Sequence, residues 1–428
     1  MTTLPLSSHG KPIDTFGRAA ELDSELRRAV RGEVRFDRGS RALYASDASN
    51  YRQVPIGVVV PRDEEDVRAA VAVCRAFDAP ILARGSGTSL AGQSCNVAVV
   101  LDFTKYMNRI LDIDIEKRVA RVQPGVILDT LRAKAEQNHL TFGPDPSTHS
   151  RCSLGGMIGN NSCGTHSLIS GKTVDNVHEL RILLYDGTEL TVGPVSDGEL
   201  DAIIRSGGRR GEIHAALKSI RDRYVTHIRE GFPKIPRRVS GYNLDELLPE
   251  NGFNVARALV GTEGTCVIVL GATLRLIDSP QHRVLVGLGY PDSFAAADHV
   301  PAILETSPIG LEGFEGGIID GLTFKGAPNL ELLPQGRGIL LAEYGSNDAA
   351  ECRASAEALV RKLSTLPGAP LTRIYNAPEA KAVWKIRESG PRMASSQPSK
   401  RGSDPGTADA IRGPDSRIFH TAFASGAL

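Results

Sequence analysis

The feature that most constrains the fold of this chain is an alternation of apolar strands with an amphipathic helix, beginning at residue 56. The apolar run IGVVV is followed by the helical pattern EEDVRAAVAVCRAF, then by PILARG and later by AVVLDF. Strand, helix and strand in this order are typical of a parallel βαβ unit. The chain has 428 residues, of which 41% are hydrophobic, so it is long enough for two or three packed units.

Charge and hydrophobic pattern argue against several classes of protein. Fifty basic residues balance fifty acidic residues, so no overall field would attract nucleic acid or an anionic membrane. Nowhere do eighteen apolar residues run together, and the N-terminus lacks the basic and apolar regions of a secretion signal. We therefore expect a cytoplasmic protein with no transmembrane segment and no nucleic-acid partner.

The six cysteines are scattered, with no CxxC pair among them, and the ten histidines form no HxxH or HExxH pattern. Such spacing supports neither an iron–sulfur ligand run nor a zinc site nor a secreted disulfide framework. We expect buried or tolerated thiols, no metal site, and no iron–sulfur cluster in this chain.

The patterns divide the chain into four segments. Residues 1–50 are predicted to be a helical lead-in, and residues 51–278 hold the βαβ unit, a loop-rich stretch and a hairpin around Asp186-Gly187. After about residue 278 two further βαβ units follow, which predict a ferredoxin-like domain over 279–390. Residues 391–428 have no periodicity and are predicted to be disordered.

Two local patterns within residues 51–278 carry further expectations. The run ARALVGTEGTCVIVLGATLRLI, residues 256–277, suggests two strands around a glycine turn. The helical pattern over 211–230 places five large side chains on one face, which predicts core packing. These side chains are Ile213, Leu217, Ile220, Tyr224 and Ile228.

A turn rich in glycine and hydroxyl side chains follows the strand pattern PILARG. Its third glycine, Gly92, comes two residues too late for the GxGxxG motif, and no lysine closes the turn as a P-loop requires. What remains is a loop whose backbone N–H groups from Gly85 to Ser89, with the hydroxyls of Thr88 and Ser89, suit phosphate oxygens. A plain glycine loop is the alternative for an isolated GSG string.

Three further segments accompany this loop, namely PDPS at 144–147, LGGMIGNNSCG at 154–164 and VGTEGT at 260–265. Together the four ordered motifs resemble the FAD-binding domain of the vanillyl-alcohol oxidase and p-cresol methylhydroxylase type. The likeness is closest to large bacterial D-2-hydroxyglutarate or D-lactate dehydrogenases that carry a C-terminal iron–sulfur module, and it covers roughly residues 45–389. The resemblance implies an α+β fold, with a two-subdomain FAD-binding domain over 51–278 followed by a partial ferredoxin-like cap domain over 279–390.

The resemblance also implies which residues contact FAD. The first loop is matched to the pyrophosphate and residues 145–147 to the isoalloxazine, while glycines allow the chain to pass close to the dinucleotide. The residues assigned to FAD in this way are Arg84, Gly85, Ser86, Gly87, Thr88, Ser89, Gly92, Gln93, Asp145, Pro146, Ser147, Gly155, Gly156, Asn160, Asn161, Gly164, Glu263 and Gly264. Some relatives attach the flavin through a histidine where this chain has Thr88, so non-covalent FAD is expected.

For the reaction, the resemblance implies oxidation of a small D-2-hydroxyacid, with hydride transfer to flavin N5 and an electron acceptor other than NAD. The WxxR segment ending at Arg387 resembles the clamp that holds the substrate carboxylate, although a surface arginine paired on its own helix is the alternative. Relatives place the catalytic histidine further downstream. We therefore expect the catalytic base to lie beyond this chain, in a truncated or frame-shifted product whose homology ends near Gly390.

Three functions remain open at this point. The first is an FAD-dependent 2-hydroxyacid dehydrogenase. The second is a catalytically impaired flavin-binding fragment, or a subunit that needs a partner chain to supply the missing cap or iron–sulfur module. The third is a sugar- or nucleotide-binding protein without flavin, which must explain four ordered motifs by chance.

Overall fold

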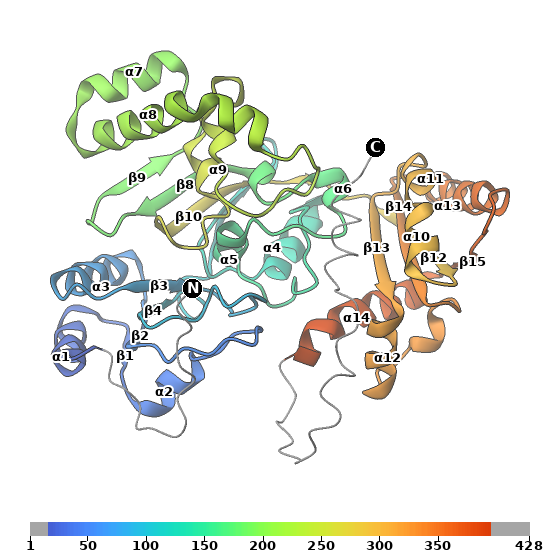
Figure 1. The fold of residues 1–428 in the computed structure, drawn as a ribbon, viewed down its shortest axis with the longest axis horizontal. Coiled ribbons are helices and arrows are strands. Elements are labelled where there is room, and N and C mark those ends of the chain that lie inside the picture. Colours follow the sequence, from blue (N-terminus) through green and yellow to red (C-terminus); the bar gives the residue numbers. More distant parts are fainter. Residues whose placement is uncertain (1–15, 395–428) are drawn as a thin grey trace.

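The computed structural model of the chain describes residues 16–394, and Figure 1 shows two halves lying side by side. The first half contains a four-stranded sheet, a five-stranded sheet and a two-stranded sheet. The second half is built on one further four-stranded sheet. The segments predicted at the two ends of the chain lie outside the described residues over 1–15 and 395–428.

The first sheet contains the predicted parallel βαβ unit. Strand β4 pairs in parallel with both β2 and β3, and β1 adds an antiparallel edge, which gives the order β1-β2-β4-β3. Asp63 caps the connecting helix α3 by accepting a hydrogen bond from the Asp66 amide. The elements are α1 (Ala19–Ala29), β1 (Glu33–Arg35), α2 (Arg38–Leu43), β2 (Gly57–Val60), α3 (Glu64–Ala76), β3 (Ile81–Arg84) and β4 (Val99–Asp102). The glycine-rich loop therefore begins at the carboxyl end of a parallel strand, where ligand-binding loops commonly lie.

The second sheet is antiparallel throughout, in the order β5-β6-β10-β8-β9. The predicted hairpin around Asp186-Gly187 is confirmed, because β8 and β9 pair across it. The strands are β5 (Ile110–Asp114), β6 (Val119–Val122), β8 (Val177–Leu183), β9 (Glu189–Val192) and β10 (Ile268–Arg275). The smallest sheet pairs β7 (Leu140–Thr141) with β11 (Ile277–Asp278).

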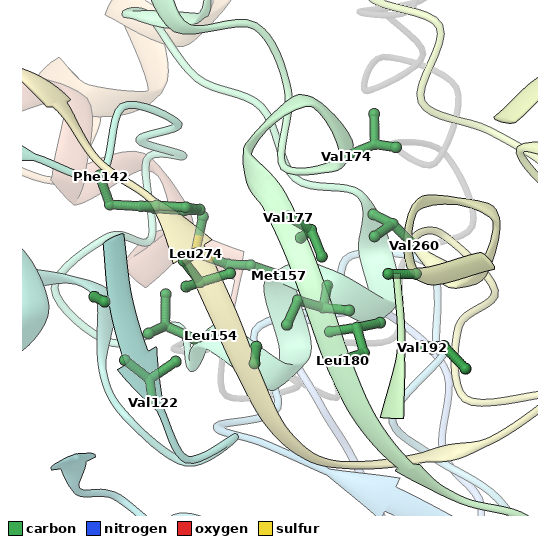
Figure 2. Close-up of a cluster of buried hydrophobic side chains, with 14 of the residues drawn as sticks. Val122, Phe142, Leu154, Met157, Val174, Val177, Leu180, Val192, Val260 and Leu274 are labelled. Atoms are coloured by element: carbon green, nitrogen blue, oxygen red, sulfur yellow. The ribbon is translucent and has the colours of Figure 1, made fainter. Parts of the chain in front are cut away.

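Helices cover the second sheet and form its core with it. Side chains from β6, β8, β10 and α5 gather there, including Val122, Leu154, Met157, Leu180 and Leu274 (Figure 2). The helices of this region are α4 (Leu128–Ala135), α5 (Leu154–Asn160), α6 (Ser167–Ser170), α7 (Asp197–Ser206), α8 (Gly208–Gly231) and α9 (Val255–Leu259). Burial of these side chains fixes α5, and with it one wall of the site described below, against the sheet.

Two expectations for this half were wrong. The first part of the run 256–277 is the short helix α9 rather than a strand, because the side chain of Asn254 caps it by accepting from the Arg257 amide. On α8, Ile220 and Tyr224 are 40% and 42% exposed, although the apolar stripe predicted that they are core residues. The inward face of α8 carries a close-approach glycine and polar residues instead. Its buried residues are Gly211, His214, Arg221 and Ile228.

The inward polar residues of α8 have a common partner. His214 and Arg221 both lie against the ring of Phe253, which is buried in the core of the second sheet. An imidazole and a guanidinium present flat faces to this ring, so they pack there without aliphatic side chains. The apolar stripe alone could not reveal this packing.

The second half has the strand order β13-β14-β12-β15, with every neighbouring pair antiparallel. Numbered along the chain this is 2-3-1-4, the order of a ferredoxin-like sheet. The strands are β12 (His282–Tyr290), β13 (Gly310–Glu315), β14 (Gly338–Ser346) and β15 (Leu371–Ile374). The predicted helix after β12 is divided in two, since Pro301 begins a new helical turn. The assignment of this unit as a partial cap domain stays a prediction.

Both faces of this sheet are covered. One core forms with α10 (Ser293–Asp298), α11 (Val300–Leu304) and α13 (Ala349–Ser364), and the other with α12 (Gly316–Phe324) and α14 (Ala377–Ala394). Figure 1 shows β13 beside α6 of the first half and α14 below the sheet. These elements form the junction between the two halves.

The described part of the chain has neither a membrane-spanning helix nor a side-chain cluster suited to a metal ion. Within residues 16–394, no helix combines the length and the apolar composition needed to cross a bilayer. The same residues contain no cluster of three or more His, Cys, Asp or Glu side chains placed to hold a metal ion. The six cysteines are free, and Cys74, Cys95, Cys152 and Cys352 are buried as expected.

Replacing Leu180 by alanine tests the core beneath the site. Leu180 of β8 is fully buried in the core that the sheet forms with its helices, so L180A should lower the free energy of unfolding by about 3 kcal/mol. The matched control is L111A on β5 of the same sheet, where Leu111 is 54% exposed and the loss should stay below about 1 kcal/mol. Urea denaturation followed by circular dichroism measures both variants, and equal losses would contradict this assignment of the core.

Candidate functional site

A cavity of about 310 Å³ lies where the glycine-rich loop, α5 and the turn after α9 meet. Most of the residues predicted to contact FAD line it, and the exceptions are Gly92, Asp145, Asn161 and Gly164. The predicted residues on its wall are Arg84, Gly85, Ser86, Gly87, Thr88, Ser89, Gln93, Pro146, Ser147, Gly155, Gly156, Asn160, Glu263 and Gly264. The fold thus brings all four sequence motifs to a single cavity.

The loop from Gly85 to Gly92 needs its glycines for two different reasons. Gly87 and Gly92 have φ of +67° and +84°, which side chains other than glycine rarely adopt. At Gly85 the reason is space, because a Cβ there would overlap the hydroxyl of Ser153 at the start of α5. The loop backbone therefore lies directly against α5, and its N–H groups and hydroxyls border the cavity.

Arg84 holds this loop in place through its side chain. Its guanidinium donates hydrogen bonds of 3.0, 2.9 and 2.7 Å to the carbonyl oxygens of Tyr44, Ser46 and Ser94. The side chain is 8% exposed and lies over the Tyr44 ring. Because these three carbonyl oxygens accept from the guanidinium, the side chain of Arg84 stabilises the loop. Only the backbone of Arg84 would then make the predicted contact with a diphosphate.

The opposite wall is formed by α5 and the turn after α9, which are joined through their backbones. Gly261 donates to the Ile158 carbonyl at 2.8 Å, and Glu263 donates to the Gly159 carbonyl at 2.9 Å. The side chain of Gln93 reaches across from the first loop to Glu263 at 3.3 Å. The predicted residues Gln93 and Glu263 therefore meet at the rim of the cavity.

Two of the predicted residues outside the wall support it from behind. Asn161, with φ of +52°, ends α5 and accepts a hydrogen bond from the Val174 amide. Gly164 packs so tightly that a Cβ would overlap the Asp145 carbonyl group. This contact places Asp145 immediately behind the wall residues Pro146 and Ser147.

Asp145 belongs to a cluster of charged and polar side chains at the junction between the two halves of the molecule. We call Asp145, His166, Glu343, Arg283 and Trp384 the junction cluster. The imidazole of His166 bonds Asp145 through Nδ1 at 2.6 Å and Glu343 of β14 through Nε2 at 2.7 Å. Arg283 of β12 donates to Glu343 at 3.1 Å, and the indole Nε1 of Trp384 on α14 donates to it at 2.9 Å.

The carboxylates on either side of His166 keep it protonated. Burial alone lowers the pKa of His166, but attraction to Asp145 and hydrogen bonds to Asp145 and Glu343 outweigh this and raise it to about 9. Burial raises the pKa values of Asp145 and Glu343, but the imidazolium of His166 holds both well below their usual range. At neutral pH the cluster is therefore an imidazolium between two carboxylates.

Arg387 lies next to this cluster and faces the same turn. Its Nη2 donates to the backbone carbonyl of Asp145 at 2.9 Å, and its Nε donates to the Glu312 carboxylate of β13 at 2.6 Å. The hydroxyl of Thr165 donates to the same Glu312 oxygen at 2.8 Å. The predicted substrate-binding arginine is therefore 9% exposed and pairs with Glu312 of another element.

Comparison with known proteins agrees with this geometry. Residues 55–193 match the family described as FAD binding domain. The chain is 32% identical to D-2-hydroxyglutarate dehydrogenase of Pseudomonas putida, over 80% of this chain and 35% of that protein. It is 33% identical to the glycolate oxidase subunit GlcD of Bacillus subtilis, over 64% of this chain and 49% of that protein. The chain thus spans about a third to a half of the length of these curated relatives.

A solved structure of p-cresol methylhydroxylase has a TM-score of 0.61 to this chain, with 14% identity, and the match covers 88% of this chain and 72% of that one. The chain therefore carries an FAD binding domain and has the fold of the p-cresol methylhydroxylase type of flavoenzyme. It is a homologue of the proteins named D-2-hydroxyglutarate dehydrogenase and glycolate oxidase subunit GlcD. The family resemblance and the α+β fold with an FAD-binding domain inferred from the four motifs are confirmed, while the partial cap domain stays a prediction.

The cavity has the chemistry that FAD needs. Glycines let the loop backbone reach a ligand, while Thr88 and Ser89 bring hydroxyl donors to the same loop. Met157, Ile158 and Leu259 give the deeper wall an apolar surface suited to a ring system. These residues fit a cofactor with both a diphosphate and a flat aromatic part.

Sequence reasoning missed the junction cluster. His166 lies just after the third motif, but Arg283, Glu312 and Glu343 lie on three strands of the other half, at distances along the chain that no motif connects. Only the pairing of β13, β14 and β12 brings them to one edge. The WxxR segment that contains Trp384 was a signal for this cluster, but it was interpreted only as the position of Arg387.

Replacing Gly85 by alanine should weaken FAD binding at least tenfold, because the new methyl group overlaps the Ser153 hydroxyl and moves the loop. Removing that oxygen in G85A/S153A should restore part of the affinity, although Ser153 also caps α5. The control is G198A, whose Cβ meets nothing within 4 Å. Flavin fluorescence titration gives the affinities, and a G85A variant that binds FAD like the control would contradict the predicted contact.

The junction cluster predicts a pH-dependent stability. With a pKa of about 9 in the folded chain and about 6.5 when unfolded, His166 contributes stability that is complete below pH 6.5. This contribution, about 3 kcal/mol, is lost as the pH rises from 6.5 to 9, and the lowered pKa values of Asp145 and Glu343 add a second loss in acid.

Urea denaturation of wild type and H166Q at pH 6, 7, 8 and 9 measures this effect. H166Q should be less stable at pH 6, by roughly 3–5 kcal/mol, and the difference between the two proteins should shrink toward pH 9. H149Q is the control, because the His149 imidazole pairs with Asp129, which is not a member of the junction cluster. A constant difference between wild type and H166Q across this range would show that His166 is not the titrating group.

Proposed function

We propose that this chain binds FAD without a covalent bond and oxidises a small D-2-hydroxyacid, similar to 2-hydroxyglutarate or lactate, to the 2-oxoacid. The observation that carries the proposal is the placement of Arg387. This arginine donates to the backbone of Asp145, whose neighbours Pro146 and Ser147 line the cavity formed by the four FAD motifs. A carboxylate-binding group and a flavin-binding cavity thus share one turn.

The cofactor supplies the hydride-accepting chemistry when it is bound. The chain's own contribution begins with the first loop, whose backbone N–H groups would bind the diphosphate, and with the apolar wall of α5, which would exclude water from the ring system. Thr88 stands on the cavity wall where some relatives have a histidine, and its hydroxyl cannot form the corresponding covalent bond. We therefore propose that FAD remains releasable.

Arg387 would hold the substrate carboxylate through its guanidinium, since arginine binds carboxylates in a planar, two-point geometry. Its side chain is fixed by Glu312 and by the Asp145 carbonyl, so the guanidinium loses little freedom when a ligand binds. This orientation would direct the α-carbon of the substrate toward the turn at 145–147.

His166 lies two residues after the third FAD motif, but it is a poor general base. Both ring nitrogens bond carboxylates, and its pKa of about 9 keeps it protonated at neutral pH, so it cannot accept the hydroxyl proton. The base expected downstream of α14 stays a prediction. Three further points also stay predictions. They are electron transfer to an acceptor other than NAD, a partner chain that completes the cap or supplies an iron–sulfur module, and a cytoplasmic location.

A second candidate is a flavin-binding fragment or subunit without turnover of its own. It is favoured by the state of His166, which is protonated at neutral pH and bonds carboxylates through both ring nitrogens. Both candidates require FAD binding. They differ in whether the bound flavin is reduced by substrate.

The test is an anaerobic titration of the FAD-loaded chain. Acid precipitation should release the yellow chromophore into the supernatant, and D-2-hydroxyglutarate or D-lactate should bleach the flavin absorbance near 450 nm. R387M should raise the KM for the substrate by a hundredfold or more while FAD affinity stays unchanged, because the carboxylate loses its cationic partner. Flavin that stays bound and oxidised with every acid would favour the second candidate, and a protein that retains no flavin would overturn both.

A further inference from the structure

Glu312 is the residue through which the structure controls Arg387. The Nε atom of Arg387 donates to Glu312 Oε2 at 2.6 Å, and the neighbouring Nη2 atom on the same edge of the guanidinium donates to the Asp145 carbonyl at 2.9 Å. Trp384, one helical turn earlier on α14, places its ring 5.9 Å from the guanidinium carbon. Strand β13, helix α14 and the turn at 145 thus each fix the orientation of this arginine.

The carboxylate of Glu312 is itself held in place. Its Oε2 atom accepts from both Arg387 and Thr165, which comes from the loop that carries His166. Its side chain is still 30% exposed, while that of Arg387 is only 9% exposed. A carboxylate ligand that reaches Arg387 would therefore meet a resident negative charge next to the guanidinium.

Two like charges beside one guanidinium repel each other. We propose that Glu312 is a positioning and specificity-determining residue, which orients Arg387 for a substrate carboxylate and at the same time limits its affinity for anions. The inference rests on the proposed function, since it takes Arg387 as the carboxylate-binding group. Because the repulsion grows with the charge of the ligand, Glu312 weakens binding of a dianion more than that of a monoanion.

This double role predicts different effects on ligand binding for two substitutions of Glu312. E312Q keeps an oxygen that accepts from Arg387 Nε but removes the charge, so positioning persists while repulsion ends. E312A removes both the acceptor and the charge, so the guanidinium loses one of its fixed contacts. A residue with only a structural role would give the same direction of change in both variants.

The experiment is isothermal titration calorimetry of the FAD-loaded full chain with oxalate and oxamate. These probes have nearly the same shape, but oxalate carries two negative charges and oxamate one. We expect E312Q to bind oxalate about tenfold more tightly than wild type and oxamate about threefold more tightly, from the removal of a unit charge at close range. E312A should bind both probes more weakly than E312Q, and both variants should bind FAD like wild type.

The matched control is D320N, which removes the acidic partner of Arg337 in an exposed ion pair of the same half of the molecule. D320N should leave the affinities for both probes unchanged. Unchanged or weaker oxalate binding in E312Q, equal gains for oxalate and oxamate, or the same gain in D320N would each overturn the proposal. Failure of every variant, wild type included, to bind either probe would also overturn it.

Failure of the proposed function gives a different result. If no 2-hydroxyacid bleaches the flavin, but oxalate binds, R387M abolishes that binding and E312Q strengthens it, then the role of Glu312 stands and the oxidation does not. If substrates bleach the flavin while E312Q leaves probe affinities unchanged, the oxidation stands and the role of Glu312 does not. With active protein, E312A should lower kcat, whereas E312Q should keep a kcat close to that of wild type. General destabilisation would not produce this difference between the two variants.

Discussion

The bonds of the His166 imidazolium to Asp145 and Glu343 are the interaction on which the arrangement of the two halves depends. Asp145 lies directly behind the wall residues Pro146 and Ser147, and Glu343 lies on a central strand of the second half. Two buried carboxylates without a cation between them would be strongly unfavourable, so neither half can move from the junction without exposing or neutralising a charge. The position of Arg387 beside the Asp145 carbonyl follows from this constraint, because α14 is docked to Glu343 through Trp384.

The cavity itself depends on close backbone approach rather than on charge. Gly85 against Ser153, Gly155 against Pro124 and Gly164 against Asp145 leave no space for a side chain. Each of these contacts brings a motif segment directly against a neighbouring segment, and the backbone N–H groups are thereby fixed before a ligand arrives. A cofactor that binds such a preformed wall needs little ordering of the protein.

The features that could be predicted from the sequence are those set by local pattern. Three of them depend on neighbouring residues, namely the βαβ unit, the hairpin at Asp186-Gly187 and the glycine loop. The fold as a whole was inferred from the resemblance of the four motifs. The errors have tertiary causes, since α8 turns His214 and Arg221 inward to meet the Phe253 ring, against its apolar stripe. The junction cluster was beyond prediction for the same reason, because Glu343 and Arg283 approach His166 only through the strand order of the sheet in the second half.

Asp145 uses its two ends for different partners, with the carboxylate on His166 and the backbone carbonyl on Arg387. Its neighbours Pro146 and Ser147 face the cavity, so a ligand that shifts this turn also shifts the arginine. The two binding events are then linked thermodynamically, and the factor by which FAD changes the affinity for a carboxylate must equal the factor by which the carboxylate changes the affinity for FAD. If both ligands shift the turn at Asp145, this one residue would couple the binding of the cofactor to that of the acid that the chain is proposed to oxidise.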